Sequence, residues 1–223
     1  MSIIDTILLN FDYALPIILI IGILVNLCFY KFIASMYKWI FYYLLIMLCI
    51  DVGARIYGQF GSNLILLPIY SVIEVIIITV FYYKFLFEAS HRLVKGLCFI
   101  ASLYILWEII ILIGIETSQF QSYAKVADNF VVVTLTLAYF HEKIYIFKES
   151  KWDNFQFNTV VLVYFFLNMI FFLPINFLIN ESTGLKFYFW FGTNILTLLF
   201  YSYLTHSIWK NGRTRKLLPS GSR

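Results

Sequence analysis

Seven long apolar segments, separated by short polar connections, constrain this chain more than any other feature of its sequence. Residues 63–85 are typical, with a single carboxylate, Glu74, near the middle. A bilayer core about 30 Å thick is crossed by roughly 20 helical residues. We therefore expect seven transmembrane helices, at residues 14–30, 39–57, 63–85, 97–115, 125–146, 159–179 and 187–209.

Composition supports this interpretation. The chain has 223 residues, of which 62% are hydrophobic and 13% are charged. A soluble domain carries about 25% charged residues, so the lipid bilayer is the expected partner of the apolar surface. The sequence predicts an all-α membrane protein, with a single seven-helix transmembrane bundle at residues 1–209 and a basic cytoplasmic tail at residues 210–223.

Lysine and arginine residues lie mainly in alternate connections and in the tail. Apart from the last residue, Arg223, twelve of them fall on one side of the expected membrane and three on the other, the three being Arg55, Lys125 and Lys186. Because cytoplasmic loops are enriched in basic residues, we expect the N-terminus outside and the C-terminus in the cytoplasm. Basic residues placed in short loops between apolar segments do not indicate nucleic acid as a partner.

Two pairs of polar residues inside the apolar segments have the i, i+4 spacing of neighbours on one helical face. Asp51 and Arg55 are expected to form an ion pair, and Tyr70 to donate a hydrogen bond to Glu74. A charge near the bilayer centre costs at least about 2.5 kcal/mol, so it is retained where something pairs with it or uses it. For Asp51 and Arg55 two interpretations stay open, a local ion pair that stabilises the helix and a part of a binding site.

Glu108, in the fourth segment, adds a carboxylate at a similar depth. Asp51, Glu74 and Glu108, set against Arg55, leave two surplus negative charges. Either a buried carboxylate keeps its proton, or a cation enters from outside. The sequence therefore favours a site for a proton or a small cationic ligand.

Amide side chains inside the segments extend this polar set. Such amides commonly form hydrogen bonds between helices, and contact with a ligand is the alternative. As a set they predict a polar pocket opening to the outer face, because small-molecule sites in bundles lie between helices. The predicted ligand-binding residues are Asp51, Arg55, Tyr70, Glu74, Glu108, Asn129 and Asn194.

Sequence motifs of familiar catalytic and cofactor sites are not found. The chain has no GxSxG, P-loop, GxGxxG or HExxH pattern. His141 and Glu142 are adjacent but lack the spacing of metal ligands, so we interpret His141 as a helix-end residue. We predict no catalytic residue, no metal and no cofactor. Tyr82 and Tyr83 are expected to anchor a helix end at the membrane interface.

Four residues in the second and third segments form a recognisable pattern. An acidic residue late in the second segment, Asp51, is followed by N-x6-Y-x3-E in the third, which is Asn63, Tyr70 and Glu74. This pattern resembles that of a group of small seven-helix membrane proteins of Bacteroidota. Their seventh helix is similar to FGTNILTLLFYSYL, with Asn194 in its polar position.

The resemblance implies a multi-pass protein of the bacterial inner membrane. Proteins of this group often occur alongside sensor histidine kinases, which implies a membrane or cytoplasmic signalling partner of that kind. Association of this sort is weak evidence for function.

Four functions stay open. A receptor-like sensor is favoured, with an outward-facing pocket for a proton or a small polar or cationic ligand and signalling to a cytoplasmic partner, because a charged outer pocket is combined with almost no soluble mass. A proton- or cation-coupled transporter using Glu74 and Glu108 is the alternative, although the internal repeats common in transporters are not evident. An intramembrane enzyme is less favoured, because no nucleophile or metal triad is recognisable. A structural subunit of a larger complex is the fourth.

Overall fold

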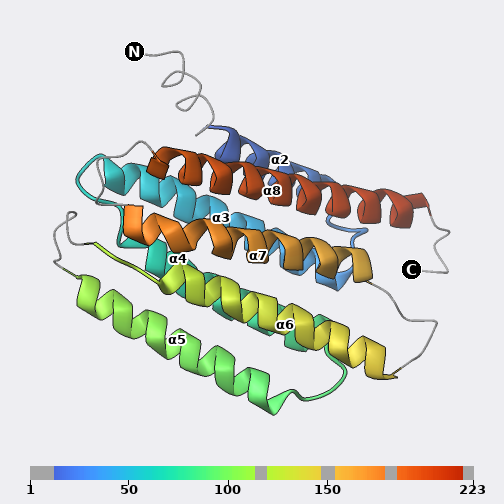
Figure 1. Ribbon diagram of the computed structural model, residues 1–223. Helices are drawn as coiled ribbons and strands as arrows, with labels where there is room; N and C mark the ends of the chain where they lie inside the picture. The colour runs from blue at the N-terminus through green and yellow to red at the C-terminus, as the bar shows by residue number, and fades with distance from the viewer. Residues whose placement is uncertain (1–12, 114–119, 147–153, 179–184, 218–223) are drawn as a thin grey trace. The chain divides into compact units, whose positions relative to one another are not determined.

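The computed structural model describes residues 13–113, 120–146, 154–178 and 185–217. Regular structure in these residues consists of seven α-helices, so the prediction of an all-α protein is confirmed (Figure 1). The helices are α2 (Ala14–Phe29), α3 (Ser35–Gly58), α4 (Leu66–Phe85), α5 (Arg92–Leu112), α6 (Ala124–Ile146), α7 (Phe155–Leu178) and α8 (Leu185–Leu217).

Four helices extend well beyond the apolar segments that predicted them. α3 begins at Ser35, α5 at Arg92 and α7 at Phe155, and α8 continues eight residues past Trp209 to Leu217. Hydropathy falls where lysine and arginine begin, but both are good helix formers and their long side chains reach toward water. Residues 210–217 of the expected tail are therefore the last turns of a helix.

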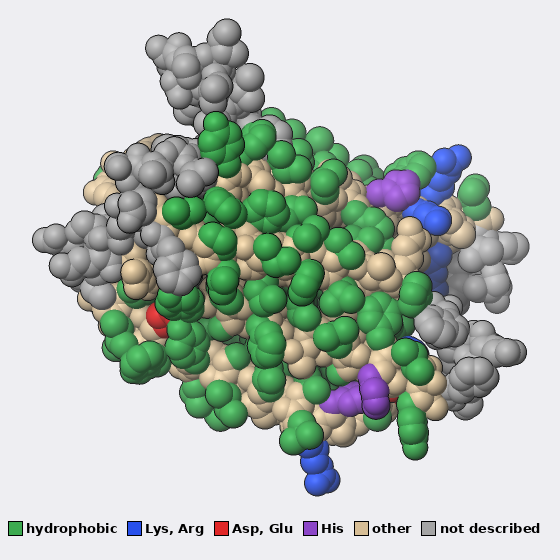
Figure 2. Space-filling model, viewed as in Figure 1, with side chains coloured by type: hydrophobic (Ala, Val, Ile, Leu, Met, Phe, Trp, Pro, Cys, Tyr) green, Lys and Arg blue, Asp and Glu red, His purple; other side chains and the backbone are tan. Residues whose placement is uncertain are grey.

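Four helices are long and apolar enough to cross a membrane, judged by length and composition over the described residues. They are Ser35–Gly58, Leu66–Phe85, Arg92–Leu112 and Phe155–Ile175, and Ala14–Phe29 is a shorter apolar helix. Many of their exposed side chains are large and hydrophobic, and hydrophobic side chains cover most of the face seen in Figure 2, where few Lys and Arg side chains are visible. So much apolar surface is typical of a protein that meets lipid.

The chain divides into two compact units. Unit 1 comprises Met1–Gln59 with Asn194–Arg223, and unit 2 comprises Phe60–Thr193. Unit 1 therefore holds α2, α3 and most of α8, and unit 2 holds α4 to α7 with the start of α8.

Small residues allow close helix packing in unit 1. A Cβ atom added to Gly22 of α2 would lie 2.6 Å from Thr205 Oγ1 of α8, and one added to Gly212 would lie 2.5 Å from Phe29 Cβ. Glycine at such points lets helix backbones approach, as in many membrane bundles. Asn211 Oδ1 also accepts a hydrogen bond of 3.1 Å from the backbone N–H of Ala34, which fixes α8 against the start of α3.

Helix α6 is the centre of unit 2, because it packs against α4, α5 and α7 (Figure 1). Its side chains at Val131, Val132 and Leu135 are completely buried. Polar residues on the same helix are therefore also drawn inside, and they need partners there.

One buried polar network links three of these helices. The Tyr82 hydroxyl of α4 lies 2.8 Å from Thr136 Oγ1 of α6 and donates a hydrogen bond of 2.8 Å to Asn158 Oδ1 of α7. Tyr82 is only 1% exposed, so the expectation that it anchors the helix at the membrane interface is wrong. The Tyr82 side chain can lie in the core because Thr136 and Asn158 both form hydrogen bonds with its hydroxyl group.

Candidate functional site

The most unusual group of side chains in unit 2 is a buried cluster of three charged residues. Lys125 of α6 forms ion pairs with Glu74 of α4 and with Asp128 of α6. The Lys125 Nζ atom lies 2.6 Å from Asp128 Oδ2. Lys125 is 2% exposed, and both carboxylates are fully buried. We call Glu74, Lys125 and Asp128 the ion cluster.

Local helical geometry accounts for one of the two ion pairs in the ion cluster. Lys125 and Asp128 are spaced i, i+3, so they lie on the same face of α6. Glu74 comes from the middle of α4, and the packing of α4 on α6 brings it to the other side of the ammonium group.

Aromatic side chains surround the ammonium group. Tyr70 donates a hydrogen bond of 2.9 Å to Glu74 Oε1, which confirms the bond expected from their spacing. Lys125 Nζ also lies 4.3 Å from the centroid of the Tyr70 ring and 5.8 Å from that of Phe165 on α7. Cations are attracted to such ring faces, most strongly where water is excluded.

The ion cluster has more acid than base. Two carboxylates face one ammonium, so full ionisation would leave one surplus negative charge. Among the described residues, Asp128 Oδ1 has no hydrogen-bond partner. Uncompensated charge is expensive in a low-dielectric interior, so the ion cluster is suited to hold a proton or a small cation.

Sequence reasoning placed Lys125 among the outside charges and did not select Asp128. The side chain of Lys125 is in fact buried between helices, where it pairs with Glu74 and Asp128. Hydropathy makes a lysine at the start of an apolar segment resemble a loop residue. The i, i+3 spacing of Lys125 and Asp128, inside a helix that begins at Ala124, was the signal available.

Glu108, on α5, lies beside the end of α6 that carries Lys125, and it is 6% exposed. Its Oε1 atom accepts a hydrogen bond of 3.3 Å from the backbone N–H of Ala124, the first residue of α6. A carboxylate at this position stabilises the start of a helix. Glu108 therefore positions the turn that carries Lys125.

The remaining predicted residues fall into both units. Asp51 and Arg55 form the expected ion pair in unit 1, with 2.8 Å between Arg55 Nε and Asp51 Oδ2. Asn194 also belongs to unit 1. Asn129, in unit 2, is fully buried, and its amide has no hydrogen-bond partner among the described residues. A single pocket containing all seven predicted residues stays a prediction.

A second polar group lies at the other end of α6. Glu142 accepts hydrogen bonds from the backbone N–H of Glu88 at 2.8 Å and of Ala89 at 3.5 Å, and it lies 2.5 Å from His91 Nε2. Lys143 pairs with Glu88 at 2.7 Å. Glu142 therefore holds the connection between α4 and α5. Sequence reasoning compared Glu142 only with its neighbour His141 and missed the partner on another element.

Comparison of the chain with protein-family models, with curated proteins and with solved structures finds no match.

Proposed function

We propose that this chain is an integral membrane protein of the receptor-like sensor kind, whose signal is a proton or a small cationic ligand that reaches the ion cluster from the outer side. All seven helices would cross the bacterial inner membrane, with the N-terminus outside and the C-terminus in the cytoplasm. The observation that carries the proposal is the burial of two carboxylates around one ammonium group.

The chemistry of the ion cluster supports a cationic signal. The Lys125 ammonium is a tethered cation held between Glu74 and Asp128. A proton or an arriving cation that neutralises one carboxylate weakens the hold on Lys125, and Lys125 can then take another position. Coulombic attraction at such short range is strong in a low-dielectric site, so a single charge is enough to shift the balance between two arrangements.

Helix α6 supplies a route to the cytoplasmic side. It carries Lys125 and Asp128 near its beginning and Glu142 near its end, roughly 25 Å away at about 1.5 Å per residue. Glu142 binds the connection between α4 and α5, which contains His91. A movement of α6 would therefore change the surface offered to a cytoplasmic partner, and the resemblance of the sequence makes a histidine kinase our choice of partner.

The experiment compares binding in the intact protein and in three variants. Protein in lipid nanodiscs is titrated with protons, Na⁺ and guanidinium, and the thermal unfolding midpoint is measured. We expect one of these probes to raise the midpoint in a saturable manner.

Glu74→Gln and Asp128→Asn are expected to abolish that rise, because each removes a charge from the ion cluster. Glu88→Gln removes a charge from the connection between α4 and α5, beside the other end of α6, and should leave the rise intact. If none of the three probes has a saturable effect, the proposal is wrong.

A proton- or cation-coupled transporter is the second candidate, and the same ion cluster favours it. Charged residues within spanning segments are also typical of ion relays. Flux separates the two functions. A transporter in proteoliposomes moves protons or Na⁺ down a gradient and loses this activity in Glu74→Gln, whereas a sensor binds the cation without net flux.

A further inference from the structure

A groove runs along unit 2 between α4 and α5. It has a volume of about 530 Å³ and is open on one side. Its walls are mainly apolar, with Ile76 and Val80 from α4 and Cys98 and Phe99 from α5. Ile76, Val80 and Phe99 are 52%, 42% and 65% exposed, so the described residues do not cover this groove.

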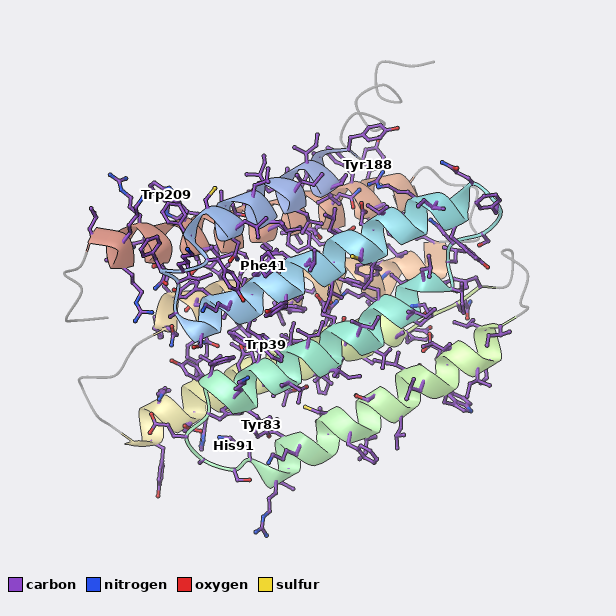
Figure 3. The ribbon with its side chains drawn as sticks, turned by 180° about the vertical axis from the view of Figure 1, so that it is seen from behind. Trp39, Phe41, Tyr83, His91, Tyr188 and Trp209 are labelled. Carbon is purple, nitrogen blue, oxygen red and sulfur yellow. The ribbon has the colours of Figure 1, made fainter. Side chains whose placement is uncertain are left out.

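One end of the groove is cationic. Lys84 lies in the last turn of α4 and Lys95 in the first turn of α5, and both line the groove. The Tyr83 side chain of α4 reaches the connection between α4 and α5, where its hydroxyl donates a hydrogen bond of 2.9 Å to the carbonyl of His91 (Figure 3). Lys95 Nζ lies 4.6 Å from the centroid of that ring. No carboxylate pairs with Lys95 in the described part of the chain.

The start of α5 also favours an anion at this end of the groove. Helix N-termini carry partial positive charge, and acidic side chains normally compensate it. The first turn of α5 contains no acidic residue and instead carries Arg92 and Lys95. An anion bound beside Lys84 and Lys95 would offset this accumulation of positive charge.

We propose that the α4–α5 groove binds one anionic phospholipid, with the phosphate at Lys84 and Lys95 and an acyl chain along Ile76, Val80 and Phe99. The proposal rests on the membrane location given in the proposed function, and it does not depend on the ion cluster. Basic pockets between membrane helices on the cytoplasmic side are a known setting for anionic headgroups.

The dimensions of the groove fit this occupant. Lys84 and Ile76 are eight residues apart on α4, and Lys95 and Ser102 are seven apart on α5, so the groove extends roughly 11 Å along both helices. One leaflet of the hydrocarbon core is about 15 Å deep. The cationic end lies at the helix termini, where lysine side chains meet the headgroup region. A free phosphate would occupy the cationic end alone and leave the apolar length empty.

The experiment measures bound lipid directly. Protein purified in a mild detergent is mixed with phosphatidylglycerol, phosphatidylcholine or inorganic phosphate, and native mass spectrometry gives the bound fraction. We expect phosphatidylglycerol to bind at least fivefold more tightly than phosphatidylcholine. The double variant Lys84→Gln with Lys95→Gln should lose that preference. The control is Lys31→Gln with Lys38→Gln, because Lys38 also faces a tyrosine ring, at 4.9 Å from the centroid of Tyr30.

A second variant tests the apolar part of the groove while both lysines stay in place. Ser102→Phe places a ring at the far end, and it should weaken phosphatidylglycerol binding at least threefold without changing the thermal unfolding midpoint. Equal binding of the two lipids, or a preference that survives removal of Lys84 and Lys95, would overturn the proposal and identify the groove as an ordinary lipid contact. Loss of bound phosphatidylglycerol to inorganic phosphate would show that only a free anion is recognised.

Discussion

The Lys125 Nζ atom lies 2.6 Å from Asp128 Oδ2, one turn along α6, and neither side chain is more than 2% exposed. Glu74 approaches the same ammonium group from α4. Lys125 therefore pairs with both of these buried carboxylates, and stability should depend on it.

Lys125→Met is expected to destabilise the protein by about 3–5 kcal/mol, because it removes the ammonium group that pairs with buried Glu74 and Asp128. The free energy of unfolding is measured by denaturant titration of the protein in mixed micelles. The triple variant Lys125→Met, Glu74→Gln and Asp128→Asn removes all the charges, and it should recover most of the loss. A triple variant as unstable as Lys125→Met alone would show that packing, and not charge, is what the lysine provides.

Tyr82→Phe is expected to destabilise unit 2 by about 1–3 kcal/mol. The change removes one hydroxyl and leaves Thr136 Oγ1 and Asn158 Oδ1 in the core without it. The measurement is the same denaturant titration. Tyr145→Phe on α6 is the matched control, because Tyr145 is 84% exposed and its loss should change stability little.

Gly22→Ala is expected to destabilise unit 1, because the new methyl group would lie 2.6 Å from Thr205 Oγ1 and 3.1 Å from Leu44 Cδ1. Such overpacking costs about 1–3 kcal/mol. Gly53→Ala on α3 is the control, since a Cβ there meets no atom within 4 Å. Alanine favours helix over glycine, so Gly53→Ala should raise the unfolding midpoint slightly. Equal effects of the two substitutions would contradict the close packing at Gly22.

Of the contacts within single helices, the sequence predicted two correctly and missed Lys125 with Asp128, and it missed the contacts between helices. Asp51 with Arg55 and Tyr70 with Glu74 follow from the fixed spacing of an α-helix. Lys125 with Glu74 and Glu142 with His91 join residues about 50 positions apart. Such pairs depend on how each helix is rotated against its neighbours, and that rotation is set by the packing of many side chains together.

Most helix ends were predicted within about four residues, and the end of α8 was missed for a related reason. Apolar segments mark where a chain prefers lipid, whereas backbone hydrogen bonds mark where a helix ends. At α8 these differ, because the helix continues through Lys210, Arg213 and Lys216 to Leu217. The buried position of Lys125 was missed by the same criterion, since a charge at the start of an apolar segment was taken as the end of the span.

Asp128→Asn is expected to change the protection of the connection between α4 and α5, although that connection lies at the opposite end of α6. The backbone N–H groups of Glu88 and Ala89 donate hydrogen bonds to Glu142, so their exchange with deuterium reports how firmly α6 holds the connection. If α6 transmits a change in the ion cluster, exchange at Glu88 and Ala89 should alter at least threefold.

Thr134→Val, on the same helix but outside the ion cluster, is the control. Glu142→Gln should accelerate exchange at both amides directly, which proves that the measurement is sensitive there. If Glu142→Gln has this effect and Asp128→Asn has none, α6 does not connect the two ends, and a sensor would need another route.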